Sequence, residues 1–153
     1  MTKSFTKQIL NKNGVTLIFV ILVLLVMTIL GVAVFTLFSS NLATAKSQQD
    51  SVKAHFLAIS GVEIAFAAVL DNTDGDPLIV SYFKRDDITS TMIPLTDTIE
   101  LDEGEVEIEI SSYIENEERY IKISAEGIPN NTTVTRLLNM HFNARFPEIQ
   151  RWD

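Results

Sequence analysis

The sequence predicts an α+β protein in which one long N-terminal helix packs on a small antiparallel β-sheet. Three observations carry this prediction. No charged residue occurs between Lys12 and Lys46. From there to Leu70, apolar residues recur with helical spacing. Beyond Asp76 the apolar spacing becomes two residues, as in a strand. A chain of 153 residues leaves room for one folded domain after the apolar segment.

The apolar segment, residues 15–38, has the length and composition of a membrane span. Of its 24 residues, 18 are Val, Leu, Ile or Phe. As a helix it would extend about 36 Å, enough to cross a hydrocarbon core of about 30 Å. Three lysines precede it and all 20 acidic residues follow it, so we expect a cytoplasmic N-terminus and an extracytoplasmic C-terminal part. An ordinary signal peptide ending at Ala43-Thr44-Ala45 is an alternative, although such peptides have shorter apolar cores.

The helix should continue beyond the membrane to Leu70, because residues 39–70 contain no proline. The Asp- and Gly-rich stretch 71–77 then ends it with turn-forming residues. One set of apolar residues recurs with helical spacing, and we expect it to face the sheet. Its members are Val52, Phe56, Ile59, Phe66 and Leu70.

The β-rich part should form a sheet of about four strands with one apolar face. The alternation around Ile110 and Ile123 predicts a hairpin whose loop is Glu115–Glu118, with Ile114 opposite Arg119. We expect further strands at Leu78–Phe83, Leu95–Leu101 and Thr132–Phe142. In the C-terminal tail, Ile149 and Trp152 should pack back on the sheet edge, with contact to a partner as the alternative.

No catalytic motif is recognisable, so we do not expect an enzyme. The chain has no cysteine, which excludes a disulfide, a thiol nucleophile and a zinc site built on sulfur. His55 and His141 occur in no metal or triad pattern and are expected to be surface or packing residues.

The junction before the apolar segment reads Asn-Lys-Asn-Gly-Val-Thr-Leu-Ile, from residue 11 to residue 18. It resembles the class III signal of type IV prepilins and pseudopilins, in which a short basic leader ends in glycine. Gly14, Thr16, Leu17 and Ile18 match that pattern, and Val15 replaces the usual phenylalanine. The resemblance implies cleavage between Gly14 and Val15 by a prepilin peptidase and N-methylation of the new Val15 amine.

Phe19 departs from the family pattern, because most members carry glutamate at this fifth position after the cut. That glutamate pairs with the terminal amine of the subunit assembled before. Minor pilins of the PilX type lack it, and residues 60–65 (Ser-Gly-Val-Glu-Ile-Ala) also resemble them. The resemblance therefore implies a minor pilin or pseudopilin that primes or tips a pilus, secretion or competence filament. Its partners would be other pilins, the assembly platform protein and its ATPase.

The resemblance divides the chain into a leader (1–14), a long helix (15–70, with 15–38 in the membrane) and a β-rich globular region (71–153). No cofactor is expected. After loss of the three leader lysines, 9 basic residues face 20 acidic ones, a net charge of −11, which disfavours direct binding of nucleic acid. The alternative is a single-pass anchored binding or sensing domain that does not polymerise.

Two further candidate sites depend on acidic residues. Glu63 interrupts the apolar stripe. It either reaches water at the edge of the stripe or is a paired carboxylate, inside the folded domain or facing a neighbouring subunit. The candidate partners are Arg119, Lys122 and Arg136. The loop after the helix carries three aspartates that calcium could use, although a helix-ending turn explains the same residues. They are Asp71, Asp74 and Asp76.

Overall fold

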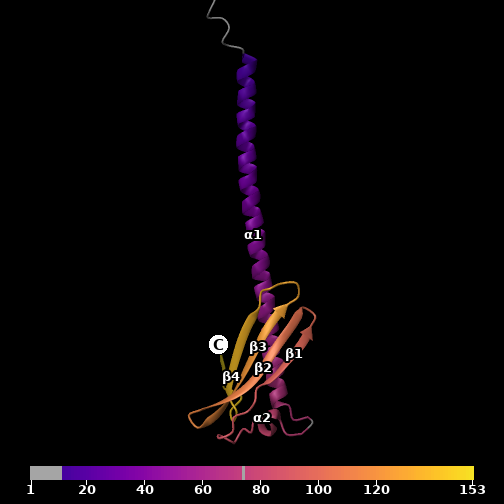
Figure 1. Ribbon diagram of the computed structural model, residues 1–153, viewed down its shortest axis with the longest axis vertical. Helices are drawn as coiled ribbons and strands as arrows, with labels where there is room; N and C mark the ends of the chain where they lie inside the picture. The colour runs from indigo at the N-terminus through magenta and orange to yellow at the C-terminus, as the bar shows by residue number, and fades with distance from the viewer. Residues whose placement is uncertain (1–11, 74) are drawn as a thin grey trace, which may run out of the picture. The chain divides into compact units, whose positions relative to one another are not determined.

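The computed structural model describes residues 12–73 and 75–153, with the side chains from Thr16 onward. It contains two helices and one five-stranded antiparallel sheet (Figure 1). The elements are α1 (Lys12–Leu70), α2 (Leu78–Ser81), β1 (Leu95–Leu101), β2 (Gly104–Glu115), β3 (Glu118–Pro129), β4 (Arg136–Asn143) and β5 (Gln150–Trp152). The chain divides into two compact units, Met1–Ala45 and Lys46–Asp153, which are described separately below. The second unit is called the head.

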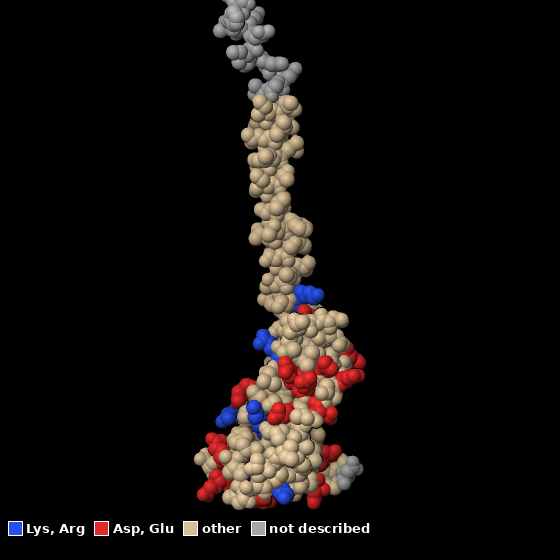
Figure 2. Space-filling view, in the orientation of Figure 1, with Lys and Arg blue, Asp and Glu red and all other residues tan. Residues whose placement is uncertain are grey.

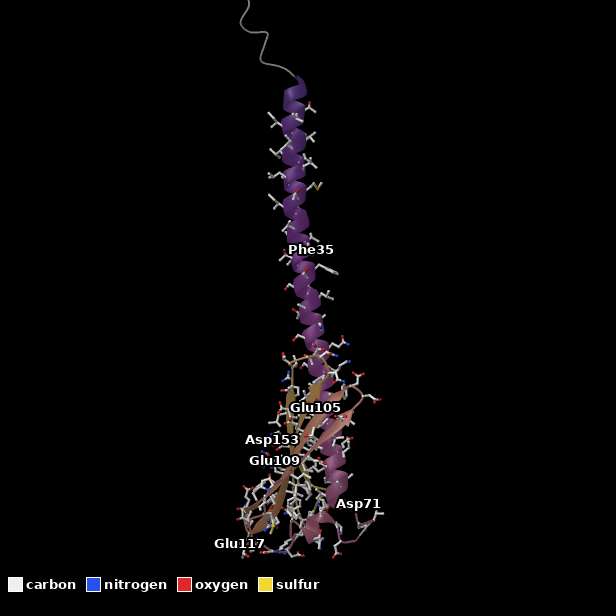
Figure 3. The ribbon with its side chains drawn as sticks, turned by 45° about the vertical axis from the view of Figure 1, so that its right-hand side comes forward. Phe35, Asp71, Glu105, Glu109, Glu117 and Asp153 are labelled. Carbon is white, nitrogen blue, oxygen red and sulfur yellow. The ribbon has the colours of Figure 1, made fainter. Side chains whose placement is uncertain are left out.

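The part of α1 that lies in the first unit is apolar and exposed on all sides. Every residue from Thr16 to Ala45 is exposed, including Phe35, whose exposed fraction is 71%. Phe35 is labelled in Figure 3 among the side chains that project from this helix. Figure 2 shows neither acidic nor basic side chains along this segment. By length and composition, α1 can cross a membrane.

In the head, α1 packs on the sheet through its small residues. Ala54, Ala58, Val62, Ala65 and Val69 are buried, and their spacing of three or four residues forms one stripe. Two glycines allow the close approach of helix and sheet. A Cβ at Gly61 would lie 2.3 Å from Val106 Cγ1, and a Cβ at Gly127 would lie 2.2 Å from the Ala54 carbonyl oxygen.

The predicted packing face of this helix was therefore wrong in its first half. Val52 and Phe56 are exposed, at 53% and 63%, and lie largely on the opposite side of the helix from the buried stripe. Only the end of the predicted stripe, Phe66 and Leu70, packs against the core. The face of α1 that packs on the sheet is the one whose small side chains let the two backbones approach closely. The bulky Phe56 side chain would prevent this approach.

The hairpin of β2 and β3 has the predicted register. Ile110 pairs with Ile123, and Ile114 pairs with Arg119. The loop is shorter than predicted, because Glu115 and Glu118 also pair. Asn116 and Glu117 then form a two-residue turn, both with positive φ (51° and 63°), which suits the twist of a tight hairpin.

The remaining strands follow in chain order, so the sheet is β1-β2-β3-β4-β5. The Leu95–Leu101 strand was predicted correctly, whereas the expected third strand begins later, at Arg136. The inner, helix-facing side carries the largest fully buried side chains of the sheet: Ile121, Ile123, Met140, Phe142 and Val106. The outer side carries the alternate residues, most of them polar.

The predicted strand at Leu78–Phe83 is wrong, because the segment contains the short helix α2. Pro77 precedes it, and the Val80 and Ser81 amides donate to the Pro77 carbonyl oxygen at 2.8 and 2.9 Å. Ile79 and Phe83 are buried. Ser81, which would lie on the same side as these two residues in a strand, is exposed, as expected for a helical turn.

The C-terminal tail returns to the sheet as predicted but is not buried there. Residues 150–152 pair with β4, with Trp152 opposite Met140. Asn139 and Asp153 exchange two further backbone hydrogen bonds of 3.0 Å. Ile149 and Trp152 nevertheless remain 67% and 47% exposed, so the tail lies on the sheet edge without burying these two side chains.

Candidate functional site

The predicted processing site lies at the start of α1. The helix begins at Lys12, so Gly14 and Val15 fall in its first turns, although their side chains lie outside the described set. Phe19 is 65% exposed. Cleavage after Gly14, methylation of Val15 and the docking role of position 19 remain predictions.

A second apolar surface lies on the helix in the head. Val52 and Phe56 project from the side of α1 that faces away from the sheet. Phe56 borders a shallow concavity of about 480 Å³, together with Leu57 and Leu101. The Lys53–Glu103 ion pair, with an N–O distance of 2.5 Å, crosses its rim and joins the helix to the β1–β2 turn. An exposed aromatic ring beside a hollow is a surface suited to contact with another molecule.

Glu63 is exposed and forms no hydrogen bond or ion pair with any described residue, which agrees with the solvated alternative. Its three candidate partners lie elsewhere. Arg136 donates to the Ser51 hydroxyl at 2.9 and 3.0 Å, Arg119 is buried against a loop, and Lys122 lies on the outer face of the sheet.

Arg119 fixes the loop between α2 and β1. Its side chain is buried, and it donates to the carbonyl oxygens of Asp87 and Ser90 at 2.6 to 2.9 Å. A further bond of 2.9 Å reaches the Ser112 hydroxyl. No carboxylate among the described residues pairs with this guanidinium. Carbonyl dipoles therefore compensate its buried charge, which gives Arg119 a structural role.

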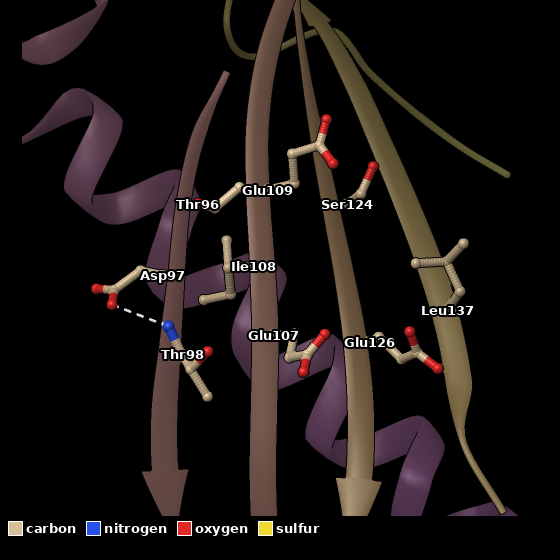
Figure 4. Close-up of a pocket in the computed structure, with 9 residues that line it drawn as sticks. All are labelled: Thr96, Asp97, Thr98, Glu107, Ile108, Glu109, Ser124, Glu126 and Leu137. Carbon is tan, nitrogen blue, oxygen red and sulfur yellow. Dashed lines mark hydrogen bonds between the residues drawn. The ribbon is translucent and has the colours of Figure 1, made fainter. Parts of the chain in front are cut away.

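Acidic residues gather at one end of the outer face of the sheet (Figure 4). Glu107 lies directly opposite Glu126, and Glu109 follows on the same strand, around a concavity of about 470 Å³. Like charges in directly opposed positions destabilise a sheet slightly. Among residues 16–73 and 75–153, no group of three potential metal ligands comes together. We interpret this surface as a solvated acidic face.

An aromatic cluster that the sequence analysis missed lies at the other end of the outer face. Tyr113 and Tyr120 are cross-strand partners, with ring centroids 5.5 Å apart and an interplanar angle of 16°. The Tyr113 hydroxyl and His141 Nδ1 are 3.1 Å apart and hydrogen-bonded. His141 Nε2 lies 3.2 Å from Asp153 Oδ2, without a hydrogen bond between the two atoms.

The Tyr113, His141 and Asp153 side chains lie next to one another, but this arrangement does not activate the tyrosine. Burial raises the pKa of the Tyr113 hydroxyl above its ordinary value of 10.0. The hydroxyl therefore stays protonated at neutral pH and serves as a hydrogen-bonding group, not as a nucleophile. His141 is partly buried and packs in this cluster, while His55 is exposed on α1.

Beside these rings is a concavity of about 390 Å³, here called the tyrosine pocket. Tyr113, Tyr120, Glu118, Asn143, Phe146 and Arg151 contribute to its wall. Strands β2 to β4 position the first four, β5 positions Arg151, and Phe146 lies between β4 and β5. Asn143 Nδ2 donates to Glu118 Oε2 at 2.5 Å, which fixes both side chains at the pocket.

In the candidate calcium loop, hydrogen bonds within the loop account for the first aspartate. The Asp71 carboxylate accepts hydrogen bonds from the Thr73 hydroxyl and amide at 2.5 and 3.0 Å. These bonds lower the pKa of Asp71 below its ordinary value of 3.8 and form the turn that follows α1. Asp76 is exposed and Asp74 lies outside the described residues, so calcium binding stays a prediction.

Comparison of the chain with protein-family models gives no match, and comparison with curated proteins gives none.

Proposed function

We propose that the chain is a minor type IV pilin or pseudopilin, made as a prepilin and assembled into a filament. One structural observation carries the proposal. A single helix, Lys12–Leu70, has an apolar first part with every described side chain exposed and a last part that belongs to the core of the head. Such a helix requires an apolar environment that the chain itself does not supply. Lipid supplies it before assembly, and neighbouring helices supply it in the filament.

The outward-facing side of α1 in the head also supports assembly. Val52 and Phe56 are exposed next to the concavity at Leu101. A membrane anchor alone gives no reason for apolar side chains on this part of the helix. Neighbouring subunits in a filament would cover them, which recovers about 25 cal/mol per Å² of apolar surface buried.

Phe19 supports a minor role in the filament. Its ring cannot accept a hydrogen bond from the terminal ammonium of a preceding subunit. The Val15 amine of this chain remains able to receive a following subunit that carries the glutamate. The chain is therefore suited to begin a filament or occupy its tip and is poorly suited to extend one. The acidic head, with 9 basic and 20 acidic residues from Lys46 onward, is suited to the exposed surface of such a filament.

The test is self-assembly in cells that express the chain with the filament machinery. With the wild-type chain as the only pilin we expect no fibres, and with a glutamate-bearing pilin we expect the chain to be scarce in purified filaments. Phe19→Glu should let the chain enter internal positions, measured by its share of filament mass. Leu22→Glu is the matched control, since it adds the same carboxylate at a position without the docking role, and it should stay excluded.

Two results would contradict the proposal. Filaments in which the wild-type chain is the most abundant subunit would show that it is a major pilin. If the chain stays uncut in the membrane and never enters a filament, the single-pass anchored domain is the correct interpretation.

A further inference from the structure

We propose that the tyrosine pocket of the head binds a carbohydrate. The site is in the head, and the proposal does not depend on assembly into a filament. It rests on one aromatic surface and on two polar side chains that the fold leaves with unused hydrogen-bonding capacity.

The aromatic surface is the ring of Tyr120. One face of the ring stacks on Tyr113, and the ring meets no other aromatic ring among residues 16–73 and 75–153. Phe146, which is half-exposed, lines the same pocket. The C–H face of a sugar ring is a flat, weakly polar surface that matches the electron-rich face of a tyrosine. The Tyr113–Tyr120 stack and the strand pairing beneath it hold this surface in place before any ligand arrives.

The two polar side chains are Glu118 and Arg151. Glu118 Oε2 accepts bonds from Asn143 and from the Tyr120 hydroxyl, at 2.5 and 3.4 Å, while Oε1 has no hydrogen bond to a described residue. Arg151 is exposed, and its only polar contact with the described residues joins Nε to Asp153 at 3.7 Å. The pocket therefore offers a free acceptor and free donors. A sugar hydroxyl uses both, because it donates one hydrogen bond and accepts others.

The same pair of charges argues against other ligands. Glu118 would repel an anion and Arg151 would repel a cation, so the pocket is suited to a neutral molecule. A purely apolar ligand would desolvate both side chains without replacing their hydrogen bonds. The volume of about 390 Å³ is at the small end for ligand pockets and fits one or two sugar rings. For a single ring we expect a Kd on the order of 1 mM.

The experiment measures sugar binding by the full chain with saturation-transfer NMR, in a zwitterionic detergent that carries no sugar headgroup. The probes are the methyl glycosides of glucose, galactose, mannose and N-acetylglucosamine and their disaccharides. We expect at least one of them to show saturable transfer, strongest on the C–H protons of one ring face. The absence of saturable transfer from all of them at about 10 mM, tenfold above the expected Kd, would overturn the proposal.

Single substitutions test whether the sugar binds in the tyrosine pocket. Tyr120→Ala and Arg151→Ala should each lower the affinity at least about tenfold, while Tyr120→Phe, which keeps the ring, should change it less than about threefold. Glu107→Gln, at the acidic end of the same sheet face, is the matched control and should have no effect. Because Arg151 is exposed, its replacement tests the pocket even if Tyr120→Ala unfolds the head. Binding that survives Arg151→Ala, or that Glu107→Gln abolishes equally, would contradict the assignment to this pocket.

Discussion

At the scale of single residues, the arrangement around Arg119 explains how a loop without regular structure is held on the sheet. The segment between α2 and β1 presents the carbonyl oxygens of Asp87 and Ser90 to one buried guanidinium. From the sequence, Arg119 was predicted to lie opposite Ile114 and was a candidate partner of Glu63. The hairpin register places it opposite Ile114, but no sequence pattern shows that a distant loop would supply its acceptors.

Arg119→Ala should lower the free energy of unfolding of the head by about 2 to 4 kcal/mol, because three partly buried acceptors lose their donor. The measurement is denaturant unfolding of a soluble fragment beginning at Asn41, which we expect to be folded and monomeric. Arg136→Ala is the matched control. Its exposed side chain bonds only to Ser51 among the described residues, and the loss should stay below about 1 kcal/mol. Equal losses in the two variants would show that Arg119 does not hold the loop.

Asp87 should make the stability of this loop depend on pH. Its carboxylate accepts hydrogen bonds from the Ser90 hydroxyl and from the amide and hydroxyl of Thr89. These bonds hold the pKa of Asp87 well below its ordinary value of 3.8. A carboxyl whose pKa is lower in the folded state stabilises that state above its unfolded pKa, and this contribution is lost as the pH falls toward the folded pKa.

We therefore expect Asp87→Asn to be less stable than wild type at about pH 6 and the difference to shrink by about pH 3. Denaturant unfolding of the Asn41 fragment at several pH values measures this. Glu63→Gln serves as the control, since Glu63 is exposed and its carboxylate bonds to no described residue. A difference between Asp87→Asn and wild type that stays constant across this range would contradict the assigned role of the carboxylate.

At the scale of elements, the sequence predicted the sheet better than it predicted the contact between helix and sheet. The alternation and the hairpin register follow from apolar residues at every second position, and both were confirmed. The Tyr113–Tyr120 pair also follows from that register by counting back one residue on one strand and forward one on the other. The helix carries apolar residues on two faces, so its spacing alone could not decide which face packs.

What decided the packing face was residue size, not hydrophobicity. At Gly61 and Gly127 the helix and the sheet approach so closely that a Cβ at either position would clash. Likewise α2 could not be recognised from its apolar run, because four helical residues are too few for a clear period. How far Ile149 and Trp152 are covered depends on the shape of the sheet edge. That shape is set by residues distant in the sequence, so the tail sequence alone does not predict it.

The packing face can be tested with neighbouring residues on α1. Leu57→Ala should lower the free energy of unfolding by about 2 to 4 kcal/mol, since Leu57 is part of the buried core. Phe56→Ala should lower it by less than about 1 kcal/mol, because Phe56 is exposed. Denaturant unfolding of the Asn41 fragment provides both values. A larger loss for Phe56→Ala than for Leu57→Ala would mean that the helix packs through its other face.

At the scale of the whole molecule, the chain combines a helix that can cross a membrane with a head that has its own core. The head contains the sheet and the second part of α1. The apolar residues of the first unit and Phe56 of the head are exposed, and both are available for contacts outside the chain. In the proposed filament, other subunits would cover both sets of residues, whereas a membrane anchor alone would cover only the first.

The central claim is that the chain is processed as a prepilin, and the most direct test is the N-terminus of the mature protein. The full chain is co-expressed with a prepilin peptidase, and the membrane and filament fractions are analysed by intact-mass spectrometry and N-terminal sequencing. Gly14→Leu is the control, because a bulky side chain at the cut should keep the peptidase from the backbone. The account predicts a chain that begins with N-methylated Val15 and a Gly14→Leu variant that stays uncut. A mature wild-type chain that still begins at Met1 in the filament or surface fraction would contradict it.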